Sequence, residues 1–265
     1  MCFSRHLAYF AVAFNASTLR DIHCQGMMKI DKAVLLAAGR GTRMRDLTAD
    51  LPKPMIKVRN KPVLLHIIEG LQAAGIKDFL VVIGYRCDVV KDYFGDGTCF
   101  GLRIKYATQV VQDGTGRVVD LAREFVCDGP FVLSYGDILV DFANYRELVT
   151  LPDDVAAIIS VKKNEDVSKG GAVFFNDNFE LTDLREKPKP GELTSPWYNA
   201  GIYAFRPNIF EYTARLQPSP RGEYELTDAI RELAHSGQKV KGLELTGNWA
   251  DVRDPEILAE LNREA

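Results

Sequence analysis

The sequence predicts an α/β fold of the Rossmann-like, three-layer type, with a mostly parallel central sheet. Two observations support this prediction. Short apolar segments typical of buried parallel strands alternate with amphipathic helical segments, and glycine-containing or polar loops follow several of these strands directly. A chain of 265 residues with 46% hydrophobic residues can also bury a large core.

The first half of the chain alternates strand and helix. The apolar run 33–37 predicts a buried strand, and residues 63–74 carry apolar side chains spaced for one face of a helix that ends at Gly75. Further strands are expected at 79–83, 102–107 and 130–134, and further helices at 89–94 and 116–125.

The second half contains less helix. Strands are expected at 156–161, 171–175, 179–184 and 198–205, and helices at 223–234 and 255–261. We expect a single domain over 28–265, in which the halves 28–137 and 138–251 share one sheet and 252–265 forms a closing helix. In open α/β sheets, ligands bind outside the carboxyl ends of the strands, so the loops there are the candidate site.

The loop after the first strand has the composition of a phosphate site. Gly39 and Gly41 let backbone N–H groups approach an anion closely, and Arg40 and Arg43 add positive charge. Further along, Lys53 stands between two prolines, which is a rigid setting for a cation. The combination indicates more than one phosphate group.

Two common phosphate motifs do not fit. A Walker A loop requires Gly-Lys-Ser/Thr, whereas Gly41 is followed by Thr42 and Arg43. A dinucleotide fingerprint requires a third glycine where Met44 stands, and an acid after the next strand, which this chain lacks. A Rossmann oxidoreductase is therefore disfavoured.

These residues do resemble another signature, that of the sugar-1-phosphate nucleotidyltransferases. The pattern L-A-A-G-x-G-T-R-M, then L-T, then L-P-K-P-M, stands at Leu36 to Met55. Later elements follow in the family's order: Gln109 before Gly114-Thr115-Gly116, Gly136-Asp137, Glu186-Lys187-Pro188, Asn199-Ala200-Gly201-Ile202-Tyr203 and Trp249-Ala250-Asp251. Together they cover Met28 to about Asp251, so the resemblance extends over most of the chain.

The resemblance implies an enzyme that transfers a nucleoside monophosphate from a nucleoside triphosphate to a sugar-1-phosphate with the help of Mg²⁺, releasing pyrophosphate. The attacking phosphate oxygen is already ionised, so no histidine or cysteine base is needed. Charge neutralisation and in-line positioning are what the reaction requires. On this view 28–137 is the nucleotide-binding half and 138–251 the sugar-phosphate-binding half.

The same resemblance assigns residues to roles. It implies catalytic roles for Arg43 and Lys53; nucleotide contacts from Leu36, Ala38, Gly39, Gly41, Thr42, Gln109, Gly114 and Thr115; sugar-phosphate contacts from Gly171, Glu186, Lys187 and Asn199; and Mg²⁺ ligation by Asp137 and Asp251. Carboxylates suit Mg²⁺, which usually binds one or two of them together with substrate phosphates.

Each assignment has a structural alternative. Gly-Asp after a strand is a common turn, and Asp251 could be a surface acid before the last helix. Glu186 and Lys187 lie in a charged run, and such runs are usually solvated. Gln109 stands near a strand end, where polar residues are ordinary.

Two other functions stay open. A cytidylyltransferase for an alcohol phosphate such as phosphocholine would share the loop, but its relatives typically read P-K-A-L where this chain has P-K-P-M. A non-catalytic, sugar-nucleotide-binding paralogue would be expected to lack Arg43, Lys53 or Asp137, and all three are present. Uridine or thymidine with glucose-1-phosphate is expected from the commonest relatives; guanosine with mannose- or heptose-1-phosphate, and uridine with an N-acetylated sugar, are alternatives.

The remaining features concern partners and location. A net charge of −3 implies no nucleic-acid partner. The apolar run 7–14 is too short to span a bilayer, so no membrane association is expected. We favour translation from Met27 or Met28 over a weak signal peptide, which makes 1–27 an extension outside the fold.

Five cysteines in no metal-binding spacing indicate reduced thiols, and with nucleotide substrates they favour the cytoplasm. Only 14 residues follow Asp251, and no hexapeptide repeats are present. We therefore expect a stand-alone enzyme without the β-helix of bifunctional relatives.

Overall fold

A twisted central sheet organises the computed structural model, which describes residues 26–48, 50–192 and 194–263. Within these residues nine strands form the sheet. Along its main path the strands are β12 (Leu181–Glu186), β11 (Gly171–Phe175), β13 (Trp197–Phe205), β7 (Phe131–Tyr135), β2 (Lys32–Ala37), β5 (Asp78–Ile83) and β6 (Arg103–Thr108). Two more, β10 (Ala157–Lys163) and β14 (Val240–Glu244), extend from β13.

Strand direction divides this sheet into two parts. From β7 through β2 and β5 to β6 every pairing is parallel. Beyond β7, β13 runs antiparallel, as do its pairings with β10 and β11. The predicted Rossmann-like α/β class is confirmed, and the second half is the mixed part of the sheet.

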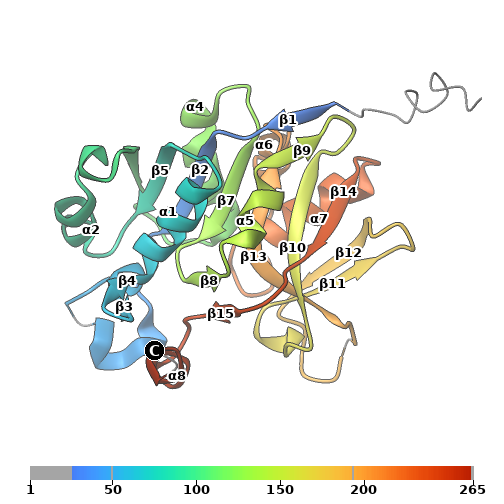
Figure 1. Cartoon of the computed structure of the whole chain (residues 1–265). Coiled ribbons are helices and arrows are strands. Elements are labelled where there is room, and N and C mark those ends of the chain that lie inside the picture. Colours follow the sequence, from blue (N-terminus) through green and yellow to red (C-terminus); the bar gives the residue numbers. More distant parts are fainter. Residues whose placement is uncertain (1–25, 49, 193, 264–265) are drawn as a thin grey trace, which may run out of the picture.

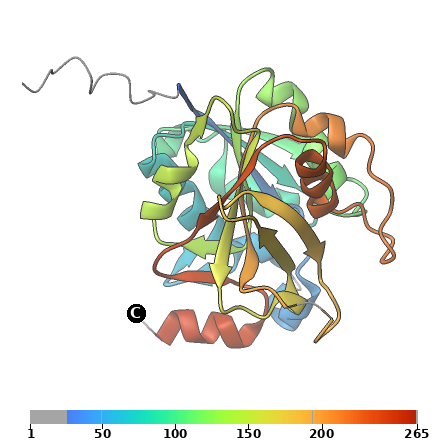
Figure 2. The same ribbon diagram turned by 90° about the vertical axis from the view of Figure 1, so that its right-hand side faces the viewer.

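Helices cover both faces of the sheet, which gives three layers (Figures 1 and 2). One face packs on α1 (Val63–Ala73), α2 (Cys87–Phe94) and α5 (Ala143–Leu148). The other face packs on α3 (Thr115–Val119), α4 (Arg123–Val126), α6 (Ile209–Thr213) and α7 (Leu226–His235). Alternation along β2 explains the two cores, because Ala33 and Leu35 belong to the first and Val34 to the second. Burial of both faces accounts for the continuous apolar run in β2.

Short elements complete the chain. Three two-stranded pairings join β1 (Met27–Lys29) with β9 (Thr150–Pro152), β3 (Lys57–Val58) with β4 (Lys61–Pro62), and β8 (Ile138–Val140) with β15 (Trp249–Asp251). Short 3₁₀ helices stand at Thr42–Thr48, Lys53–Met55, Thr98–Phe100, Asp120–Ala122 and Val167–Lys169. The last helix is α8 (Pro255–Arg263).

The pairing of β1 bears on the expected N-terminal boundary. Met27 lies opposite Pro152, so the described fold already includes the residue before position 28. Gly26 is also described, and its carbonyl accepts from the Asp153 amide. The rest of the expected extension, 1–25, lies outside the described residues. No helix in the described part of the chain has both the length and the apolar character needed to cross a membrane.

Three expected elements differ from the structure. The single helix predicted at 116–125 is divided into α3, a 3₁₀ turn and α4. At this break, Asp120 accepts hydrogen bonds from the side chains of Thr213 and Arg123. The strand predicted from 179 begins at Leu181, because Phe179 has a positive φ of 58° in the preceding turn. The helix predicted from 223 begins at Leu226, because the preceding residue is extended.

Candidate active site

Two parallel strands bring the glycine loop after β2 and Asp137 together. The carboxyl ends of β2 and β7 are neighbours, and the Gly136 amide donates to the Leu36 carbonyl at 3.0 Å. A Cβ on Gly136 would lie 2.8 Å from that carbonyl oxygen, so glycine is required by this close approach. The Gly-Asp sequence after β7 therefore forms a turn and also allows close contact with the end of β2.

A separate pairing brings Asp251 to the same place. On β15, Asp251 lies opposite Ile138 of β8, the residue after Asp137. The amide of Val252 donates to the Asp137 carbonyl at 2.9 Å. Two acids far apart in the sequence thus lie beside each other at the carboxyl end of the sheet.

Lys53 lies between these two acids. Its Nζ is in hydrogen-bonding contact with Asp137 Oδ2 and 3.8 Å from Asp251 Oδ1. The stem of Lys53 packs against Gly41, where a Cβ would lie 2.7 Å from the lysine Cβ and where φ is +71°. The glycine loop and the lysine after Pro52 therefore form one rigid unit.

A cavity of about 330 Å³ opens beside this group. Its lining includes many of the residues singled out by sequence: Gly39, Gly41, Arg43, Lys53, Asp137, Gly171, Glu186, Lys187, Asn199 and Asp251. It also includes residues that sequence reasoning did not select: Tyr135, Ile138, Lys169, Gly170, Tyr198, Gly201 and Arg253. The loop after β2 and the strands of the second half of the chain thus face one space.

Electrostatics at the acidic pair favour a bound cation. Burial raises the pKa of Asp251 above its usual value, and the nearby Asp137 carboxylate raises it further, whereas Lys53, Arg253 and Arg43 lower it. A pair of like charges in a partly buried wall is stabilised by a shared positive charge. Lys53 supplies part of that charge.

The donor set of this pair fits Mg²⁺. Both side chains offer carboxylate oxygens toward a common cation, with the cavity open beside them. Among the described residues, no group of three or more His, Cys, Asp and Glu side chains is placed so that it could hold a metal ion. A site of two carboxylates suits an ion that keeps waters and binds substrate phosphates.

The remaining residues expected to contact the nucleotide do not line the cavity. The Ala38 carbonyl accepts from Gln112 Nε2 at 3.1 Å, and the amide of Gln109 is held by the Ile83 carbonyl. The Gln109 side chain donates to the Gly114 carbonyl at 3.5 Å. The Gln112 bond therefore joins the segment after β6 to the loop after β2, and the Thr42 backbone lies in the 3₁₀ helix of that loop.

The segment 113–116 is fixed to a distant part of the chain. The Tyr224 amide donates to the Asp113 carbonyl at 2.8 Å, and the Gly116 amide donates to the Tyr224 carbonyl at 2.7 Å. Gly114 has a φ of +118°, and a Cβ there would lie 2.4 Å from the Tyr224 oxygen. Only glycine fits this backbone crossing.

The opposite wall is built on the antiparallel strands. Glu186 of β12 lies opposite Gly171 of β11. Lys187 follows with a positive φ of 39°, and its amide donates to the Gly170 carbonyl. Asn199 is buried, and its Oδ1 accepts from the Tyr203 hydroxyl at 2.9 Å. Asn199 therefore has a structural partner on one side and the cavity on the other.

Glu186 is an acid in a desolvated position. Burial raises its pKa to about 6, against the lowering effect of Lys187 and Arg221. Its Oε1 lies 3.6 Å from Lys187 Nζ and 3.9 Å from Arg221 Nη1. Arg221 also pairs with buried Glu225 at 3.0 Å. The charged run around 185–189 is therefore partly buried in this wall rather than solvated throughout.

Arg221 and Arg253 were missed because neither stands in a motif used for the sequence argument. Arg221 precedes a glycine in a loop, and Arg253 follows Asp251 by two residues. Arg253 reaches the cavity because it follows β15, which pairs with β8, whereas Arg221 contacts the wall through its ion pair with Glu186. The signal available in sequence was only their proximity to other charged residues.

Comparison with known proteins agrees with the geometry. The family model described as "Nucleotidyl transferase" matches residues 32–265, so the chain belongs to the nucleotidyl transferase family. The chain is 38% identical over 232 residues to the "Bifunctional protein GlmU" of Methanococcus maripaludis strain C7, which covers 87% of this chain and 54% of that protein. It is 33% identical over 235 residues to the "Glucose-1-phosphate thymidylyltransferase" of Streptomyces griseus, covering 88% of this chain and 65% of that protein.

The chain thus spans about half the length of the GlmU proteins that it matches. Among solved structures, UDP-glucose pyrophosphorylase in complex with UDP-glucose superposes with a TM-score of 0.79, covering 89% of this chain and 98% of that chain. Its sequence identity is 22%, and the likeness concerns the fold.

Proposed function

We propose that this protein transfers a nucleoside monophosphate from a nucleoside triphosphate to a sugar-1-phosphate. A phosphate oxygen of the sugar-1-phosphate attacks the α-phosphorus, the bond from that phosphorus to the bridging β-oxygen breaks, and pyrophosphate leaves. The observation that carries the proposal is the meeting of Lys53 with Asp137 and Asp251 at the edge of the glycine loop.

The residues of the chain would supply positioning and charge. Backbone N–H groups around Gly39 and Gly41 would hold the triphosphate, and exposed Arg43 would neutralise the leaving pyrophosphate. Lys53 would contact the phosphate at which substitution occurs. Because the nucleophile is already an anion, the site needs no general base.

Two separate sets of residues would bind the two substrates. Leu36, Ala38, Gln109, Gly114 and Thr115 would contact the nucleoside, and Gly171, Glu186, Lys187 and Asn199 the sugar phosphate. Asp137 and Asp251 would hold Mg²⁺. When bound, the ion supplies charge neutralisation at the reacting phosphates.

For substrates we propose thymidine or uridine triphosphate with glucose-1-phosphate. The name of the Streptomyces griseus relative supports this choice. Nucleotides and sugar phosphates as substrates, and reduced cysteines, support a place in the cytoplasm. We further propose that 1–25 is dispensable for this activity.

A matrix assay tests the proposal. Five nucleoside triphosphates are combined with a panel of sugar-1-phosphates and with phosphocholine, and pyrophosphate release is measured with and without Mg²⁺. Lys53→Met serves as the inactive control, because it removes the ammonium beside both acids. Release with at least one sugar-1-phosphate is expected. Turnover with phosphocholine alone would identify an alcohol-phosphate cytidylyltransferase, and no turnover at all would favour a non-catalytic paralogue.

A further inference from the structure

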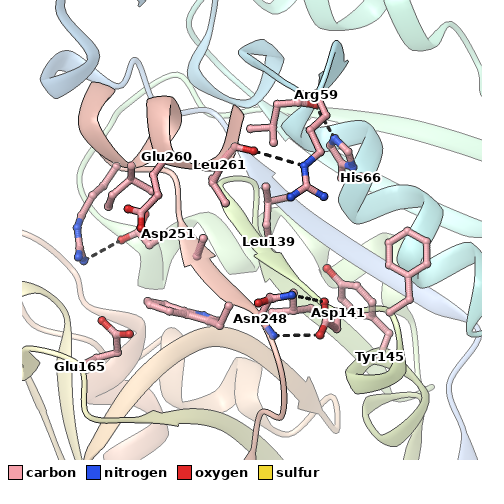
Figure 3. A pocket seen from close by; sticks show the side chains of 17 residues that line it. Arg59, His66, Leu139, Asp141, Tyr145, Glu165, Asn248, Asp251, Glu260 and Leu261 are labelled. Atoms are coloured by element: carbon pink, nitrogen blue, oxygen red, sulfur yellow. Dashed lines mark hydrogen bonds and ion pairs between the residues drawn. The ribbon is translucent and has the colours of Figure 1, made fainter. Parts of the chain in front are cut away.

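Arg253 is a cation in the cavity wall, and its buried Nη1 forms no hydrogen bond with another described residue. It follows β15 and lines the cavity of the candidate active site. It also lines a neighbouring cavity of about 640 Å³ under α8, and Figure 3 shows Asp251 on the wall of this second space. The Arg253 side chain is 15% exposed. Its Nη1 is completely buried and has no hydrogen-bond partner in the part of the chain that the structure describes.

The two acids beside Arg253 balance its charge without satisfying its N–H groups. Nη1 lies 3.6 Å from Asp251 Oδ2, and Nε lies 3.8 Å from Asp254 Oδ2. Both distances exceed that of a hydrogen bond. Asp254 is engaged elsewhere, because its Oδ1 accepts from the Ile257 amide at the start of α8.

A buried guanidinium N–H group without an acceptor costs free energy of folding, and buried polar groups usually have a hydrogen-bond partner. Its planar fork matches the oxygens of a phosphate or a carboxylate in two parallel hydrogen bonds. A buried donor that lacks an acceptor in the protein is expected at a site where a ligand supplies the missing oxygens. The position of Arg253 in the cavity then decides which ligand group that is.

Asp251 lies between Lys53 and Arg253 in the cavity wall. Its Oδ1 faces Lys53 and its Oδ2 faces Arg253, so Arg253 lies on the side away from the glycine loop. Tyr198 lines the same cavity as Arg253, and its hydroxyl packs so closely over Gly170 that a Cβ there would lie 2.2 Å from it. Gly170 in turn holds the amide of Lys187. Arg253 thus belongs to the wall that carries Glu186 and Lys187.

We infer that Arg253 binds the phosphate group of the sugar-1-phosphate. The inference rests on the proposed function and adds a residue that none of the sequence motifs contains. The triphosphate of the nucleotide is the other possible source of the same phosphate chemistry, and the experiment separates the two.

The test uses the full chain and three variants. Arg253→Met keeps the alkyl stem, and Arg253→Lys keeps the charge but loses the fork. Arg215→Met is the matched control, because Arg215 is 73% exposed and lies 4.0 Å from Glu211 on α6. Dissociation constants are measured by calorimetry for glucose-1-phosphate, or for whichever sugar-1-phosphate turns over in the matrix assay, and separately for the nucleoside triphosphate. Melting temperatures are recorded with and without each ligand.

We expect Arg253→Met to weaken sugar-1-phosphate binding at least 30-fold and to abolish the rise in melting temperature that this ligand causes. Arg253→Lys should lie between Arg253→Met and the unaltered protein, and Arg215→Met should match the unaltered protein. Affinity for the triphosphate should change less than twofold. Without ligand, Arg253→Met should melt at the same or a higher temperature, because a buried unpaired group is removed.

Three results would overturn the inference. Unchanged sugar-1-phosphate affinity in Arg253→Met would do so, as would a loss confined to the triphosphate. A lowered melting temperature with unchanged affinities would show that Arg253 only holds Asp251 and Asp254 in place. Failure of the proposed function is distinguishable, because it appears as absent turnover in the unaltered protein.

Discussion

The acidic pair allows a direct test of whether Asp137 and Asp251 act on one ion. We consider Asp137→Asn, Asp251→Asn and the double variant, each of which replaces a carboxylate by an amide of nearly the same shape. Each single change should lower turnover about 100-fold or more, which is about 2.7 kcal/mol in activation free energy. The double variant should lose scarcely more than either single one, because either change already disables the shared ion.

The distances make this magnitude reasonable. At 3.8 Å, the separation of Asp251 Oδ1 and Lys53 Nζ, two unit charges interact by about 4 kcal/mol at an effective dielectric constant of 20. A divalent ion at a similar distance would interact about twice as strongly. Part of this energy is offset because the ion and the acids give up water, so a loss of about 2.7 kcal/mol is a conservative expectation.

Two measurements are needed. Single-turnover rates give the chemical step, and calorimetry gives Mg²⁺ and triphosphate affinities separately. We expect Mg²⁺ affinity to fall in both single variants while triphosphate binding persists through the Gly39–Arg43 loop and Lys53. Near-normal turnover of Asp251→Asn with unchanged Mg²⁺ dependence would refute the paired site and leave Asp137 as the protein ligand.

Three further outcomes are expected. Gly114→Ala should raise the KM for the triphosphate at least tenfold and destabilise the protein by about 1–3 kcal/mol, because φ there is +118° and a Cβ would collide with the Tyr224 carbonyl. Gly129→Ala is the control in the same kinetics and urea titrations, because a Cβ there meets nothing within 4 Å. Burial raises the pKa of Glu186 from 4.5 to about 6, so the native state binds the proton more tightly than the unfolded state does. The free energy of unfolding should therefore fall as pH rises from about 4.5 to about 6, by at most about 2 kcal/mol. Urea unfolding at pH 4.5 to 7.5 should therefore show Glu186→Gln with a flatter profile and greater stability at pH 7.5, together with reduced turnover; a steeper profile would contradict this. Removal of 1–25 should leave activity and melting temperature unchanged, whereas removal of 1–31 should lower the melting temperature, because it deletes β1 and its pairing with β9.

Local patterns in the sequence were sufficient for the parallel half of the fold. The run 33–37 is apolar on both faces because helices cover both sides of β2, so its composition alone identifies a buried strand. The loop that follows can also be recognised locally, since paired glycines and a proline-flanked lysine are typical of a backbone that is in close contact with another group. The prediction of a single helix over 116–125 was wrong, because Thr213, which is remote in sequence, donates a hydrogen bond to Asp120 where the helix is interrupted.

The candidate site was only partly accessible to this reasoning. The three residues of β15 are too few to show a periodicity, and their pairing with β8 is what brings Asp251 to Asp137. Arg253 reaches the cavity through the same pairing. Such placements depend on tertiary contacts between distant segments, which residue spacing does not encode.

One segment links the two sides of the site. Residues 113–116 carry the loop expected to contact the nucleoside, and they are held by backbone hydrogen bonds to Tyr224. The next residue, Glu225, is buried and pairs with Arg221, which also lies 3.9 Å from Glu186 on the opposite wall. The backbone between 221 and 226 therefore supports both walls at once. Because a shift of this segment would move Gly114 and the surroundings of Glu186 together, the two substrate-facing walls form a single structural unit rather than two independent surfaces.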